Sequence, residues 1–151
     1  MSWIDKNGLS YLWNNIKEKA NAELIKYTTN DSGWVNLTPS SNFDIYSTGQ
    51  QPRIKKQGNM VIIDGAFKPK ATIASSQLTS WLLVSTVPDG WNPSHVVYKV
   101  IQGSGRAKCK LQINSSGQIL IANYGNRTTT SSIGNTVWLP MNVEYYCAVS
   151  S

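Results

Sequence analysis

Acidic residues, histidine and cysteine are scarce in this chain. Its 151 residues include 8 Asp and Glu, one His and 2 Cys, and charged residues make up 15% of the total, against roughly 25% in an average soluble domain. This scarcity disfavours most acid–base enzymes, coiled-coil proteins and charge-driven disordered tails. Uncharged Ser, Thr, Asn, Gln and Gly supply most of the polarity instead, a composition that suits a β-rich surface with many loops.

Motifs for metal binding and for nucleophilic catalysis are also missing. His95 is the only histidine, and the sequence has no C-x-x-C, H-x-x-x-H or D-x-D-x-D-G spacing of the kind that zinc and calcium sites use. No G-x-S-x-G motif marks a nucleophilic serine. Asp44, Asp64, Asp89 and Glu144 could supply a carboxylate pair for glycoside cleavage, but capping, turn and ion-pair roles are favoured. We therefore expect no metal, no cofactor and no enzymatic activity.

Long apolar runs and basic runs are absent as well. No stretch approaches the ~18 apolar residues of a membrane helix, and the first residues lack the basic start of a signal peptide. The net charge is +6, yet Lys and Arg are dispersed and form no nucleic-acid patch. Cys109 and Cys147 lie outside any C-x-x-C motif and read as two ordinary thiols from a reducing compartment, with no disulfide implied. We expect neither membrane insertion nor nucleic-acid binding.

The first part of the chain predicts one amphipathic helix. Asp5 is a suitable N-cap, and a cluster of turn-forming residues at 28–33 ends the pattern. Apolar residues recur between them at steps of three and four, which fall on one face: Leu9, Leu12, Trp13, Ile16, Ala20, Leu24 and Tyr27. Because an isolated helix of this length is marginal in water, either the rest of the chain or copies of the same helix must cover this face.

After Gly33 the pattern changes to short β-like runs separated by turns. Gly58 and Asn59 indicate a tight hairpin between the runs 52–56 and 60–67. Further along, apolar and polar residues alternate in the run 107–113, which predicts a strand with one buried face. Roughly eight to ten such strands predict a mainly β fold, an antiparallel, jelly-roll-like β-sandwich.

Tryptophan and tyrosine are abundant for a chain of this size. Trp34, Trp81 and Trp138 lie in apolar runs and are assigned to the core of the sandwich. Other rings fall in or beside predicted loops, where a flat ring can stack on a sugar while polar side chains bind its hydroxyl groups.

Two segments offer that combination of residues. They are Asp89, Trp91 and Asn92 with His95 just beyond, and Tyr124, Asn126 and Arg127. Trp91 or Tyr124 would stack on the sugar, and Arg127 would meet a phosphate or carboxylate if the polymer is anionic. The alternative is that Trp91 plugs one end of the sandwich and Tyr124 lies on a strand edge.

Five short motifs follow one another along the chain. They are D-K-N-G-L-S-Y-L-W at 5–13, the pair Gly33-Trp34, the hairpin at 52–61, the V-P-D-G-W-N-P-S loop at 87–94, and the hairpin at 113–121. In this order they resemble the C-terminal head of bacteriophage tail-fibre and baseplate receptor-binding proteins. The set spans nearly the whole chain.

The resemblance implies a homotrimer with a helical part at residues 1–29 and a receptor-binding head at 33–151. The helices would bundle through Leu9, Leu12, Trp13, Ile16, Leu24 and Tyr27. The heads would bind bacterial cell-wall polysaccharide or teichoic acid without cleaving it. The protein would lie at the tail tip or baseplate of a virion, beside other tail or baseplate proteins, after synthesis in the host cytoplasm. A purely structural tail component without a ligand, and a glycan-cleaving domain, are the alternatives.

Overall fold

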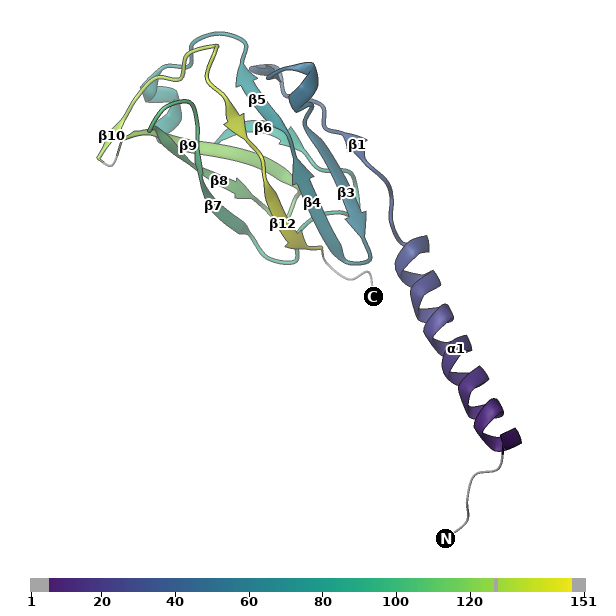
Figure 1. Ribbon diagram of the computed structural model, residues 1–151. Coiled ribbons are helices and arrows are strands. Elements are labelled where there is room, and N and C mark those ends of the chain that lie inside the picture. Colours follow the sequence, from purple (N-terminus) through teal and green to yellow (C-terminus); the bar gives the residue numbers. More distant parts are fainter. Residues whose placement is uncertain (1–5, 127, 148–151) are drawn as a thin grey trace. The chain divides into compact units, whose positions relative to one another are not determined.

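The computed structural model divides the chain into two compact units, Met1–Asp31 and Ser32–Ser151 (Figure 1). It describes residues 6–126 and 128–147, without the side chains of residue 6 and residues 25–29. Asp5, the predicted N-cap, and the side chain of Tyr27 therefore lie outside the described residues.

The first unit contains one helix, α1 (Lys6–Thr29). Its predicted apolar face is open to solvent in the single chain, with Leu9, Leu12, Trp13, Ile16 and Leu24 exposed by 48–63%. The Lys17 ammonium lies 5.4 Å from the centre of the Trp13 ring and shields part of it. An apolar stripe this exposed gives the helix no stabilisation from burial unless a partner covers it.

The second unit is built from three antiparallel sheets. One has the order β1 (Val35–Asn36), β3 (Arg53–Gln57), β4 (Met60–Asp64) and β12 (Val143–Tyr146). The largest has the order β10 (Thr129–Thr130), β9 (Gln118–Asn126), β8 (Lys108–Ile113) and β7 (Val97–Gln102), and β6 (Leu82–Thr86) also pairs with β9. The third joins β11 (Leu139–Pro140), β5 (Ala66–Pro69) and β2 (Phe43–Ile45). Two short 3-10 helices, η1 (Thr48–Gln50) and η2 (Ser75–Thr79), lie in the connections.

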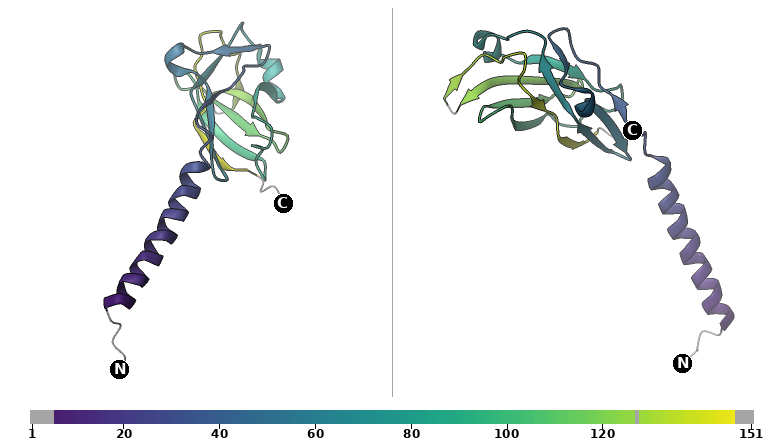
Figure 2. Two further views of the ribbon diagram at one scale, coloured as in Figure 1. Left: turned by 90° about the vertical axis from the view of Figure 1, so that its right-hand side faces the viewer. Right: turned by 45° about the horizontal axis from the view of Figure 1, so that its top comes forward.

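Side chains from all three sheets meet in one core. Ile54, Phe67, Leu111 and Ile121 are fully buried there. Figure 2 shows β7, β8 and β9 in one layer of this unit and β3 and β4 in the other. The predicted fold class, a mainly β antiparallel sandwich after an N-terminal helix, is confirmed.

Local sequence signals account for several of these strands. The predicted hairpin forms between β3 and β4, with Gln57 opposite Met60 and Gly58 at φ +58°. The run 60–67 is divided at Gly65, where φ is +100° and a Cβ atom would lie 2.4 Å from the Gln51 carbonyl oxygen. Only glycine fits that backbone approach. Along β8, buried and exposed side chains alternate as expected.

Two of the three tryptophans assigned to the core are not there. Trp34 is 42% exposed and Trp81 is 40% exposed, so that prediction is wrong for both. The Trp81 ring lies beside the exposed Tyr98, with 6.2 Å between ring centres. An apolar run shows that a strand forms, but it does not show which of the two sheet faces a given residue occupies. Trp138 is half-buried.

Both cysteines are free thiols inside the core. Burial raises the pKa of the Cys109 thiol from 9.0 to about 12. Above about pH 9 the unfolded chain therefore releases a proton that the native chain keeps. A group of this kind stabilises the native state fully below its unfolded pKa and loses that contribution as the pH rises toward its folded pKa.

We predict that the free energy of unfolding falls between about pH 9 and about pH 12, with Cys109 contributing at most ~1.4 kcal/mol per pH unit. Urea unfolding at a series of alkaline pH values measures this slope. Cys109→Ala should show a smaller slope than the wild type. Equal slopes in the two proteins would contradict the assignment.

Candidate functional site

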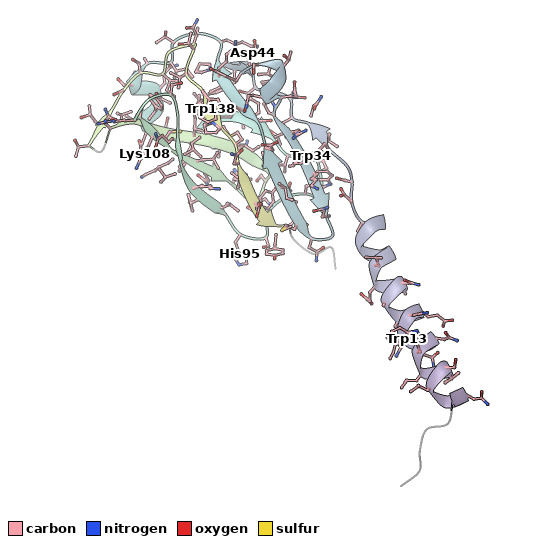
Figure 3. All side chains as sticks on the ribbon, viewed as in Figure 1. Trp13, Trp34, Asp44, His95, Lys108 and Trp138 are labelled. Atoms are coloured by element: carbon pink, nitrogen blue, oxygen red, sulfur yellow. The ribbon has the colours of Figure 1, made fainter. Side chains whose placement is uncertain are left out.

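The loop at residues 88–95 lies at one end of the head. The Val87 amide donates a hydrogen bond to the Gly117 carbonyl at 2.9 Å, which holds the start of the loop beside the β8–β9 turn. Pro93 forms an isolated β-bridge with Cys147, directly after β12. The structure thus brings Asp89, Trp91, Asn92 and His95 together in one anchored loop, and Figure 3 labels His95 at this end.

Trp91 is a structural part of this end. Its ring is partly buried and packs against the core. Its amide donates to the Pro88 carbonyl at 3.1 Å, and its carbonyl accepts a hydrogen bond from the Tyr145 hydroxyl at 2.8 Å. Burial, with a smaller contribution from Cys147, raises the pKa of Tyr145, so this phenol stays a donor at neutral pH. These contacts give Trp91 a structural role, and the stacking of its ring on a sugar stays a prediction.

The polar residues of the 88–95 loop differ in their exposure to solvent. Asn92 is half-buried, and its side-chain oxygen would lie 2.5 Å from a Cβ atom at Gly117, so it packs tightly on the neighbouring turn. Asp89 and His95 are exposed, and His95 Nδ1 lies 3.2 Å from the Ser94 hydroxyl. Asp89 and His95 are therefore the most accessible polar groups of this segment.

The described part of the second predicted segment, residues 124–126, belongs to a strand and not to a loop. Tyr124 lies on β9 and is only 6% exposed, so the expectation of an exposed ring at this position is wrong. Burial, and secondarily Cys109, raises its pKa. Asn126 is exposed at the end of β9, and Arg127 lies outside the described residues. β9 continues to Asn126 because Gly125 still pairs with Lys108 and Asn126 pairs with Thr129.

The 88–95 loop lies beside the first residue of β9, whereas Tyr124 and Asn126 lie at the other end of that strand. β9 begins at Gln118, beside the 88–95 loop, and ends at Asn126. A strand of nine residues, with a rise of ~3.3 Å per residue, has its ends more than about 25 Å apart. Lys108, which pairs with Gly125, and His95 are labelled far apart in Figure 3. Within one head these segments cannot form a single binding site.

A different surface combines an exposed ring with polar side chains. An open hollow of about 650 Å³ lies on the outer face of the β1-β3-β4-β12 sheet. We call it the Trp34 hollow. Its lining includes Trp34, Ile62, Asp64, Lys99, Asn142 and Glu144, and Figure 3 labels Trp34 beside β1 and β3.

Interactions within this surface hold the ring and its neighbours in place. The Arg53 guanidinium carbon lies 4.4 Å and the Lys55 ammonium 5.3 Å from the centre of the Trp34 ring. Arg53 also donates two hydrogen bonds to one oxygen of Asp64, from Nε at 3.1 Å and from Nη2 at 2.9 Å. On β7, the Lys99 ammonium donates a hydrogen bond to the Asn142 carbonyl.

Part of this surface was readable from the sequence. A two-residue turn at 58–59 places Arg53 opposite Asp64 and Lys55 opposite Ile62, which is the register observed. Ile54 and Ile63 point inward, so their neighbours must point outward. The contributions of Trp34, the residue before β1, and of Glu144 on β12 depend on long-range strand pairing, and no local signal marks them.

Among residues 6–126 and 128–147, no three His, Cys, Asp or Glu side chains gather closely enough to hold a metal ion. The one long helix described there is not apolar enough to span a bilayer.

A solved structure has a similar fold. It is the receptor binding protein of Listeria phage PSA, with a TM-score of 0.57 over 95% of this chain and 80% of that chain, at 16% sequence identity. No family model and no curated protein matches the sequence. The predicted resemblance to phage receptor-binding proteins is therefore confirmed as a resemblance of fold.

Truncation of Trp91 tests the structural role of this ring. We expect Trp91→Ala to lower the free energy of unfolding by ~2 kcal/mol or more, because it leaves a cavity at the end of the core. Asp89→Ala, in the same loop but exposed, should change it by less than about 0.5 kcal/mol. Urea denaturation of both variants measures the difference. A Trp91→Ala protein as stable as the wild type would show that the ring does not close this end.

Proposed function

We propose that this chain is the receptor-binding protein of a bacteriophage or phage-like particle, and that its head attaches to saccharides of a bacterial cell surface. The observation that carries the proposal is the fold match over 95% of the chain to a protein described as the receptor binding protein of Listeria phage PSA. The cell-surface polymer would be a cell-wall polysaccharide or a teichoic acid. The protein would sit at the tail tip or baseplate, against other tail proteins, after synthesis in the host cytoplasm.

In this proposal the protein is a homotrimer held by its helices. The exposed stripe of α1 supports it, since each apolar side chain buried between copies contributes ~1.5–3 kcal/mol. Three heads on one bundle also raise the effective concentration of each weak contact with a repeating polymer. The side chain of Tyr27, one of the predicted contacts, lies outside the described residues.

A charge in the stripe tests the trimer. Ile16→Asp would bury three carboxylates together, and we expect it to dissociate or weaken the assembly. Tyr11→Asp is the matched control, because Tyr11 is 71% exposed and lies outside the stripe. Light scattering of the intact proteins gives the masses. A monomeric mass for the wild type, or equal masses for the two variants, would contradict the proposal.

The proposal also holds that the ligand is bound and not changed. The scarcity of carboxylates and the single histidine support a binding role, because glycoside cleavage uses a placed pair of acids. A receptor-binding head needs only contacts that persist.

Binding to purified cell walls from a panel of Gram-positive and Gram-negative bacteria tests the function. We expect saturable retention on some walls, with no reducing sugar released over hours. Release that disappears in His95→Ala or Asp89→Ala would favour a glycan-cleaving domain. Retention on none of the walls would favour a structural tail component without a ligand.

A further inference from the structure

Trp34 is placed as a fixed platform at the surface. Trp34 is 42% exposed, and the cationic groups of Arg53 and Lys55 lie over its ring and hold it on the outer face of the sheet. A ring that is already ordered loses little conformational entropy when a ligand covers it. Its apolar surface is large, which makes it the main site in the hollow for the apolar face of a ligand.

In the Trp34 hollow, hydrogen-bond donors and acceptors surround the apolar side chain of Ile62. Lys55, Ile62 and Glu144 face one another across β3, β4 and β12 in register. Asp64 lies two residues further along β4 on the same face, so it is a diagonal neighbour of Glu144 at a spacing of about 7–8 Å. The two carboxylates accept hydrogen bonds, whereas the ammonium group of Lys99 donates them.

This arrangement fits the chemistry of a sugar ring. A pyranose has one face of C–H groups that stacks on an indole, and its edge carries hydroxyl groups that donate to carboxylates. Near Trp34, two carboxylates and three cations leave a net charge of only +1. Arg53 is already bonded to Asp64 and Lys99 to the Asn142 carbonyl, so a neutral ligand is matched better than a polyanion. We infer that the Trp34 hollow binds a neutral pyranose unit of the cell-surface glycan, with Trp34 stacking on it and Asp64 and Glu144 accepting from its hydroxyl groups. This inference rests on the proposed function.

The five-stranded sheet, β6 to β10, offers a matched comparison for the Trp34 hollow, because an exposed tryptophan also lies beside it. Trp81 is 40% exposed and lies against Tyr98, so it is equally available as a ring. None of the strands β6 to β10 contains an acidic residue. That face therefore has the aromatic surface without the carboxylates, and it serves as the control.

The test uses the full chain labelled with 5-fluorotryptophan and observed by fluorine NMR. The signals of Trp34 and Trp81 are assigned from Trp34→Phe and Trp81→Phe. The probes are the methyl glycosides of glucose, galactose and rhamnose, free N-acetylglucosamine, and glycerol phosphate as an anionic comparison. We expect at least one neutral sugar to shift the Trp34 signal saturably and to leave the Trp81 signal in place, with glycerol phosphate weaker.

Variants measure which side chains carry the affinity. Trp34→Ala should weaken binding of that sugar at least about tenfold, as truncating a central aromatic contact does, and Trp34→Phe should retain part of it. Glu144→Gln should weaken binding, whereas Trp81→Ala and Asp89→Asn should not. Melting curves establish that each variant is folded. If Trp34→Ala is unfolded, the fluorine shifts of the wild type still decide the result.

The outcomes separate this inference from the proposed function. Wall binding together with a shifted Trp34 signal supports both. Wall binding with an unmoved Trp34 signal, or with Trp81 shifted instead, overturns the inference and leaves the function standing. A shifted Trp34 signal without wall binding supports a sugar site and contradicts the function. No response to any sugar and no wall binding contradicts both.

Discussion

The alternation of side chains along the strands is the constraint on which the head depends. Strands β4 and β12 send every second side chain into the core, as Ile63 and Val143 show, and Ile54 of β3 points the same way. Their neighbours are then obliged to face solvent on the other side of the sheet. The same pairing that buries the core therefore gathers Trp34, charged groups and an apolar floor on one outer surface. A shift of register by one residue would destroy the core and this surface together.

Rigidity follows from the same pairing. Most groups of the Trp34 hollow lie on strands, and Trp34 and Asn142 directly precede β1 and β12. Arg53 contacts both the Trp34 ring and Asp64 and so links β3, β4 and the residue before β1. The 88–95 loop is also anchored, but its central ring is used to close the end of the core. A surface built on strands keeps its geometry before a ligand arrives, which favours affinity for a small sugar unit. Joining several such heads through α1 would multiply modest affinities along a repeating polymer.

The sequence predicted what short-range chemistry determines. The hairpin at 57–60 follows from Gly58, and the buried face of β8 follows from the alternation of Leu111 and Ile113 with polar neighbours. Long-range contacts were not readable. Trp91 is held by Tyr145, 54 positions away, and Tyr124 is buried because β9 continues to pair beyond the apolar run. Trp34, whose ring faces solvent, looked like a core residue because it stands in a short run with the apolar Val35 and Leu37.

The most direct measurement is a crystal structure of the protein with an oligosaccharide from a bound cell wall. The central claim is that the outer face of the β1-β3-β4-β12 sheet holds the sugar. It predicts a pyranose ring stacked on the Trp34 indole, with its hydroxyl groups within hydrogen-bond distance of Asp64 or Glu144. Sugar density at the 88–95 loop, or against Trp81 and Tyr98 on the opposite sheet, would contradict it.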